Sequence, residues 1–168
     1  MKHCMECGDR LVEKECDHEG SVPFCPSCQT FRFPVFNSAV SCLILNPDRT
    51  KLLLIQQYGR PDNVLVAGYI TKGENAETTV AREIKEETGL TIHSCVYQRS
   101  QYYERSNTLM FNYLCVADFE DLSGTNHEID QAAWFPIAEA RQAIKPNSLA
   151  SYFLHEAFPD DTEQKCIS

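Results

Sequence analysis

The stretch that decides the fold is "GYITKGENAETTVAREIKEETGL", residues 68–90. Asn75 has the side chain of a helix N-cap, and Gly89 is the residue type that commonly follows a helix C-terminus. Between these two positions the spacing predicts one helix, because apolar residues recur at every fourth position and form a single inward stripe. This stripe consists of Ala76, Val80 and Ile84.

The same helix concentrates carboxylates on one side. Glu83 and Glu87 are four positions apart, and Glu86 follows Glu83 by three. Like charges at these spacings repel, which destabilises a helix by roughly a few tenths of a kcal/mol per pair. The arrangement is understandable if a divalent cation lies against that face, since hard carboxylate oxygens suit Mg²⁺ or Mn²⁺. From the carboxylates alone, a solvated acidic face is the alternative.

The stretch resembles the Nudix box, G-x5-E-x7-R-E-U-x-E-E-x-G-U, in which U is a bulky aliphatic residue. This resemblance implies an α/β protein, a Nudix α/β/α sandwich with a mixed sheet, that uses metal ions to cleave a phosphoanhydride. Every fixed position is satisfied, by Gly68, Glu74, Arg82, Glu83, Ile84, Glu86, Glu87, Gly89 and Leu90.

The resemblance also implies roles for individual residues of the box. Glu83 and Glu87 are expected to bind Mg²⁺ or Mn²⁺, and Glu86 is expected to be a further ligand or the general base. Arg82 is expected to orient a glutamate through an ion pair. The backbone carbonyl of Ala67, just before the box, is expected to be an extra metal ligand.

Apolar runs on both sides of the box indicate mixed α/β layers. They predict strands at 38–45, 51–58, 63–70, 91–103 and 108–119, and helices at 136–144 and 148–158. The chain contains no internal repeat.

Two C-x-x-C pairs precede these elements, Cys4 with Cys7 and Cys25 with Cys28. Their spacing fits a zinc ribbon, in which four thiolates surround Zn²⁺ as a tetrahedron. We expect this zinc to be structural, because so short a segment cannot bury enough apolar surface to fold alone. Four free or redox-active cysteines are the alternative.

These features divide the chain into a zinc ribbon at 1–32, a Nudix hydrolase domain at 33–160 and a flexible tail at 161–168. A zinc ribbon directly before a Nudix domain resembles the NADH pyrophosphatase (NAD⁺ diphosphatase) branch. Members of this branch cleave NAD(H) to nicotinamide mononucleotide and AMP, and some remove NAD caps from RNA. Longer members carry a further amino-terminal domain, which we expect to be absent because Met1 stands just before the ribbon.

The branch resemblance adds three residues to the predicted site and a homodimer as the expected assembly. The segment "EIDQAAWFP" (128–136) resembles one that supplies a distant metal ligand, here Glu128. Phe33 is expected to meet the nicotinamide. Ala150 is expected to touch the substrate through its backbone.

The selectivity motif of the branch, S-Q-P-W-P-F-P-x-S, is altered here to "SQYYERSNTLM" (100–110). Gln101 remains, whereas the prolines and the tryptophan are replaced. Tyr102 and Tyr103 can still stack on a base or a nicotinamide ring, and Arg105 can meet a phosphate or ribose. The predicted substrate is therefore NADH or NAD⁺ first. FAD, ADP-ribose or a nucleotide sugar are alternatives, as is a non-catalytic Nudix ligand sensor.

The charge of the whole chain restricts its partners. A formal net charge of −9 over 168 residues argues against broad binding to nucleic acids or anionic membranes, which leaves NAD-capped RNA as the one nucleic-acid substrate considered. No apolar run approaches the roughly 20 residues of a membrane span. The start "MKHCMECGDR" lacks the apolar core of a signal peptide. We therefore expect a cytoplasmic enzyme of small-molecule substrates.

Overall fold

A computed structural model describes residues 2–159 and divides the chain into two compact units, up to Phe36 and from Asn37 onward. The sequence predicts this join after residue 32. The tail expected at 161–168 lies outside the described residues. Across the described part, none of the helices combines the length and apolar character needed to cross a membrane.

The amino-terminal unit is a small antiparallel sheet. Its strands are β1 (Val12–Cys16), β2 (Gly20–Cys25) and β3 (Thr30–Phe31), in that order, with a 3₁₀ turn η1 (Asp17–Glu19) between the first two. Its packing is slight: Phe24 meets Phe31 edge-on at 5.1 Å between ring centroids, and the Lys14 ammonium lies 4.1 Å from the Phe24 centroid. So small an apolar core favours a second source of folding free energy, such as a bound metal.

The carboxy-terminal unit is built on a mixed sheet with the strand order β7-β8-β4-β5-β9, and β6 pairs with β4 beside this path. Its strands are β4 (Asn37–Leu45), β5 (Lys51–Gln57), β6 (Val66–Tyr69), β7 (Ile92–Tyr103), β8 (Thr108–Ala117) and β9 (Ile129–Pro136). Its helices are α1 (Ala76–Thr88), α2 (Ile137–Ala143) and α3 (Leu149–Ala157), with a 3₁₀ turn η2 (Glu104–Ser106) between β7 and β8.

The pairing of β4 explains where the sheet opens. Strand β4 runs parallel to β8 from Asn37↔Thr108 to Leu45↔Val116, and it runs antiparallel to β5 and to β6. With β5 it shares only the position Leu45↔Leu52. The other end of β4 pairs with β6 instead, so β4 and β5 separate toward that end.

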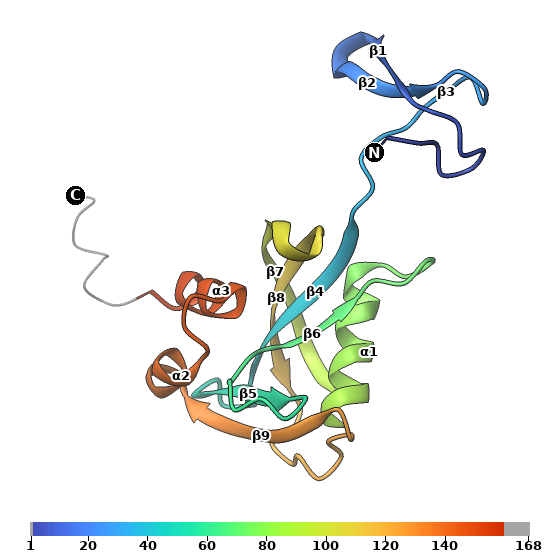
Figure 1. Ribbon diagram of the computed structural model, residues 1–168. Coiled ribbons are helices and arrows are strands. Elements are labelled where there is room, and N and C mark those ends of the chain that lie inside the picture. The colour runs from blue at the N-terminus through green and yellow to red at the C-terminus, as the bar shows by residue number, and fades with distance from the viewer. Residues whose placement is uncertain (1, 160–168) are drawn as a thin grey trace, which may run out of the picture. The chain divides into compact units, whose positions relative to one another are not determined.

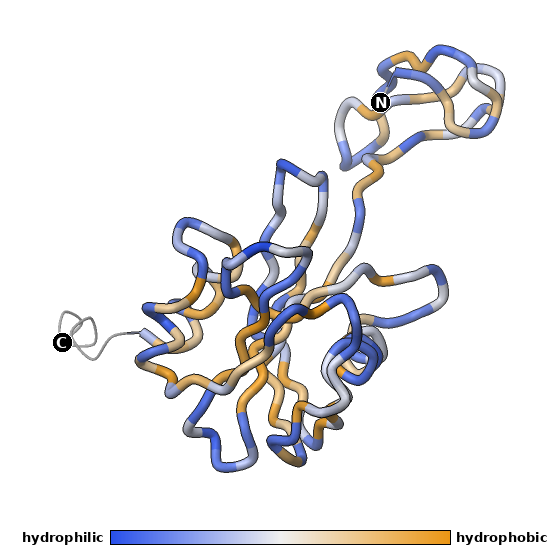
Figure 2. The backbone as a smooth tube through the Cα atoms, turned by 60° about the horizontal axis from the view of Figure 1, so that its bottom comes forward, coloured by the Kyte–Doolittle hydropathy of each residue, from blue (hydrophilic) through white to orange (hydrophobic). Residues whose placement is uncertain are grey.

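Helices cover both faces of this sheet, which confirms the α/β/α sandwich (Figure 1). On one face Val80 and Ile84 of α1 pack with Val40 of β4. On the other face Phe153 and Leu154 of α3 pack in a second apolar cluster. From Ala39 to Leu45, β4 is buried at every position, as expected of a strand covered on both faces. Figure 2 shows hydrophobic segments gathered in the interior of this unit and mostly hydrophilic segments in its outer loops.

The predicted caps of α1 are confirmed. Asn75 Oδ1 accepts a hydrogen bond of 2.8 Å from the Thr78 amide, and Gly89 adopts a left-handed conformation with φ 75°. Most predicted strands and helices match within a few residues. The third strand is shorter than expected, and the sequence analysis did not anticipate β9.

Candidate active site

A cavity of about 460 Å³ lies where α1 and β6 meet the open end of the sheet. Three carboxylates line it, from Glu83 and Glu87 on α1 and from Glu128 just before β9. The strand β6 contributes Ala67 and Gly68, so four of the predicted metal ligands share one cavity. The other lining residues are Ala39, Tyr58, Tyr69, Thr71, Arg82, Ser106, Thr108 and Met110.

Glu83 lies directly against the backbone of Gly68. A Cβ at this glycine would stand 1.9 Å from the Glu83 carboxyl carbon and 2.0 Å from Oε1. Only glycine allows this approach, because real Cβ atoms do not come so close to other heavy atoms. The glycine at the first fixed position of the box therefore leaves the room that the Glu83 carboxylate occupies.

Arg82 connects three box glutamates. Its Nε and Nη2 donate to the two carboxylate oxygens of Glu74 at 2.8 and 3.0 Å. Its Nη1 donates to Glu83 at 2.9 Å and to Glu86 at 3.1 Å. This guanidinium, with hydrogen bonds from Thr71, lowers the pKa of Glu74 to about 2. Arg82 is therefore placed to orient the carboxylates rather than to act on a substrate directly.

Glu87 is the most buried of the helix glutamates, with 5% of its surface exposed. One of its oxygens accepts a hydrogen bond of 3.2 Å from Gln57 Nε2. Burial, followed by the charges of Glu83, Glu128 and Glu86, raises the pKa of Glu87 to about 8. Burial also raises the pKa of Glu83, while Arg82 acts in the opposite direction. The cavity thus holds an excess of negative charge.

This donor set fits Mg²⁺ or Mn²⁺. All its members are oxygen donors, and a bound cation would relieve the repulsion that raises the Glu87 pKa. A wide spacing of the glutamates is compatible with Mg²⁺, because this ion commonly keeps several waters and binds through few carboxylates. Glu86 does not line the cavity; its side chain is 57% exposed and turned toward Arg82.

The predicted substrate residues Gln101, Tyr102 and Tyr103 line a different cavity, of about 310 Å³. They share it with Leu149 and Tyr152 of α3. These substrate residues therefore lie apart from the cavity of the predicted metal ligands.

Arg99 of β7 links this strand to α3 beside this second cavity. Its guanidinium donates to Tyr152 Oη at 3.1 Å and forms an ion pair with Glu156.

Three other predicted residues lie elsewhere. Arg105 is exposed in η2 and lines neither cavity. Ala150 is partly buried on α3 and packs against the apolar cluster of that face. Phe33 belongs to the amino-terminal unit and is 52% exposed.

Several cavity residues were missed by the sequence analysis. Thr108 and Met110 alternate at the start of β8, so their side chains face the same side of the sheet, and this period of two was the available signal. Ser106 lies in η2 and also lines the cavity. Tyr58 lies in the turn after β5, and nothing in its local sequence indicated that it faces the carboxylates.

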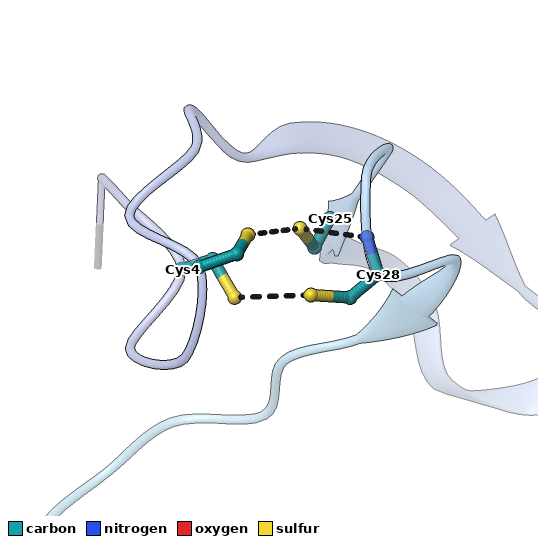
Figure 3. A group of neighbouring side chains, drawn as sticks. Cys4, Cys25 and Cys28 are labelled. Atoms are coloured by element: carbon teal, nitrogen blue, oxygen red, sulfur yellow. Dashed lines mark hydrogen bonds between the residues drawn. The ribbon is translucent and has the colours of Figure 1, made fainter.

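The four predicted zinc ligands come together in the amino-terminal unit. The sulfur atoms of Cys4, Cys7, Cys25 and Cys28 all lie within 4.8 Å of one another. The Sγ atoms of Cys4 and Cys28 are 3.9 Å apart, and those of Cys7 and Cys25 are 3.4 Å apart. Figure 3 shows the labelled cysteines facing one another. Hydrogen bonds from the backbone of Cys7 and Glu6 lower the pKa of Cys4 to about 6, so its thiol readily becomes a thiolate ligand.

Comparisons with known proteins agree on the domain that contains the cavity. The family model described as "NUDIX domain" matches residues 35–156. The NAD-capped RNA hydrolase NudC of Vibrio cholerae is 26% identical over 163 residues, which are 95% of this chain and 58% of that protein. The protein of the same name from Mycobacterium tuberculosis is 35% identical over 122 residues, 71% of this chain and 39% of that protein. The chain thus spans between about two fifths and three fifths of these relatives.

Solved structures share the fold. A NUDIX hydrolase from Nitrosomonas europaea is 20% identical, with a TM-score of 0.59 over 86% of this chain and 83% of that one. The NUDIX domain of NrtR from Shewanella oneidensis, solved with ADP ribose, is 18% identical, with a TM-score of 0.62 over 80% of this chain and 91% of that one.

Proposed function

The chain belongs to the NUDIX family, and from this premise we propose that it hydrolyses the pyrophosphate bond of a nucleoside diphosphate linked to another group. The observation that carries the proposal is the single cavity that Glu83, Glu87 and Glu128 line beside the Gly68 backbone. A buried carboxylate such as that of Glu87 normally has a partner of opposite charge or binds a metal ion.

Each residue of the cavity has a proposed task. Glu83, Glu87, Glu128 and the carbonyl of Ala67 hold Mg²⁺ or Mn²⁺. The bound cation would neutralise phosphate oxygens and lower the pKa of the attacking water. Glu86 is the general base or a further ligand, since it is exposed enough to exchange protons with solvent.

Arg82 positions these glutamates through its ion pairs with Glu74, Glu83 and Glu86. In the amino-terminal unit, Zn²⁺ on the four cysteines has a structural task. The proposed assembly is a homodimer, and the proposed location is the cytoplasm.

NADH or NAD⁺ is the first substrate we propose, with nicotinamide mononucleotide and AMP as products. The names of the two NudC relatives support an NAD-derived substrate, including NAD-capped RNA. The cavity lined by Tyr102 and Tyr103 favours a substrate with a planar ring, because aromatic side chains stack on bases. FAD, ADP-ribose and nucleotide sugars follow, because they contain the same linkage. The retention of every box glutamate favours an enzyme over a ligand sensor.

A turnover panel tests the proposal. NADH, NAD⁺, FAD, ADP-ribose, UDP-glucose and nucleoside triphosphates are each incubated with Mg²⁺ and with Mn²⁺. Glu87→Gln should be inactive, whereas Glu139→Gln, an exposed glutamate of α2 outside the cavity, should retain full turnover. Release of AMP from NADH would support a dinucleotide as the substrate. Turnover of another diphosphate alone would redefine the substrate, and binding without any turnover would support the sensor.

A further inference from the structure

The turn that follows β5 holds an aromatic residue in a costly backbone conformation. Tyr58 has φ 58° and Gly59 has φ 66°, and the Arg60 amide donates to the Gln57 carbonyl at 3.1 Å. Tyrosine rarely adopts positive φ, whereas glycine and asparagine do so readily. Core packing does not explain this choice, because Tyr58 is 72% exposed.

The surrounding structure fixes this turn. The Gly59 amide donates to Asp130 Oδ2 at 2.6 Å, and the register of β5 with β9 shifts between Gln56 and Gln57. The side chain of Gln57 donates to Glu87. The backbone of Tyr58 is therefore held between a residue that contacts the carboxylate cavity and a strand that begins beside Glu128.

Tyr58 lines two adjoining cavities. One is the carboxylate cavity, and the other is a smaller cavity of about 190 Å³. Arg60, Asp62 and Lys145 bring charge to the smaller cavity, but Lys145 and Asp62 form an ion pair at 2.7 Å. Within residues 2–159 the guanidinium of Arg60 has no hydrogen bond or ion pair. The smaller cavity thus offers one uncompensated positive charge beside an aromatic ring.

We propose that Tyr58 and Arg60 form a subsite for the part of the substrate that extends out of the carboxylate cavity. Tyr58 stacks on a planar ring of the nucleotide, and Arg60 binds a further phosphate carried by that nucleotide. This inference rests on the proposed pyrophosphate hydrolysis. The phosphate has two possible sources, a phosphomonoester on the ribose or the phosphodiester of an RNA chain, and Arg60 recognises their shared chemistry.

The contribution of the ring is tested with Tyr58→Asn. Asparagine tolerates the left-handed conformation, so this variant keeps the turn and loses the ring. We expect its thermal midpoint to be unchanged or higher and its kcat to change little. KM for the substrate that the wild type hydrolyses should rise at least about fivefold, from the loss of stacking. A lower midpoint with an unchanged KM would show a structural role and overturn the proposal.

The contribution of the cation is tested with Arg60→Ala. The matched control is Arg49→Ala, an exposed arginine with φ 59° in the turn that precedes β5. The substrates are NAD⁺, NADP⁺ and a short RNA with a 5′ NAD cap. Arg60→Ala should raise KM at least about fivefold for NADP⁺ and for the capped RNA, which carry a further phosphate. Its KM for NAD⁺ should not change, and Arg49→Ala should leave KM unchanged for all three substrates. An effect on NADP⁺ alone assigns the phosphomonoester, and an effect on capped RNA alone assigns the phosphodiester.

Two failures are distinguishable. If the wild type hydrolyses none of the diphosphates in the turnover panel, both the proposed function and the subsite are wrong. If the wild type is active and Arg60→Ala matches Arg49→Ala on NADP⁺ and capped RNA, only the subsite is wrong.

Discussion

Glu83 occupies the space that a side chain at Gly68 would need, with its carboxyl carbon 1.9 Å from where a Cβ would stand. The contact joins β6 to α1 and lies on the wall of the carboxylate cavity. It gives a physical reason for glycine at the start of the box: the backbone of residue 68 and the carboxylate of residue 83 share one small volume.

Gly68→Ala should therefore displace Glu83. We expect kcat to fall about 10²-fold, since a misplacement of about 1 Å at a catalytic centre has effects of that size. Mg²⁺ affinity, measured by calorimetry, should fall as well. If the substitution acts through Glu83, the double variant with Glu83→Ala should be no worse than Glu83→Ala alone. Additive losses would contradict this explanation.

Glu87→Gln should stabilise the metal-free protein while abolishing turnover. The pKa of Glu87 is raised to about 8, so its carboxyl destabilises the metal-free fold at every pH above its unfolded pKa. We expect the free energy of unfolding at pH 7 to rise by about 1–3 kcal/mol, measured by urea denaturation of zinc-loaded protein kept free of Mg²⁺ and Mn²⁺. Added Mg²⁺ should then stabilise the wild type and leave the variant unchanged. Glu139→Gln is the control expected to behave as wild type in both conditions.

Glu74→Gln should lower stability in a way that depends on pH. Because the folded pKa of Glu74 is lowered to about 2 from an ordinary value of 4.5, its stabilising contribution is fully present above pH 4.5. It is lost as the pH falls toward 2. The difference in urea midpoint between wild type and variant should thus be largest near neutral pH and shrink below 4.5. A difference that stays constant from pH 7 to pH 3 would show that Glu74 does not act through its charge.

The cysteine cluster should hold one zinc ion per chain. Cys25→Ser should abolish zinc binding, measured by native mass spectrometry, because it removes a buried ligand from the cluster. Amide protons of β1 and β2 should then exchange much faster, since metal binding supplies folding free energy to so small a unit. Cys16→Ser is the matched control, because Cys16 lies in the same unit but outside the cluster. Retained zinc in Cys25→Ser would contradict the assignment.

Local patterns predicted α1 and its glutamates because the information lies within one helix. Its caps, its apolar stripe and the side on which the carboxylates lie all follow from spacing along fewer than 20 residues. Strand β9 was harder to predict, because it owes its existence to pairing with β5, more than 70 positions away. Such distant pairing leaves little trace in local periodicity.

The shape of the site was also beyond local patterns. Tyr102 and Tyr103, which were expected to stack on a ring of the substrate, line a cavity separate from the metal ligands, because α3 packs next to β7. Tyr58 reaches the carboxylate cavity from a turn that Asp130 holds in place. The hydrogen bond that holds it joins the Gly59 amide to Asp130, 71 positions away. These placements depend on which segments meet in three dimensions.

The parallel pairing of β4 with β8 bears on how the chain is made. Ser41 and Asn112, 71 positions apart, lie side by side in this pairing, so β4 lacks this one of its neighbours until β8 has been synthesised. At roughly 5–20 residues per second, that interval is several seconds. During that interval β5, β6 and α1 are already available to β4, but the edge of β4 that pairs with β8 has no strand to bond to.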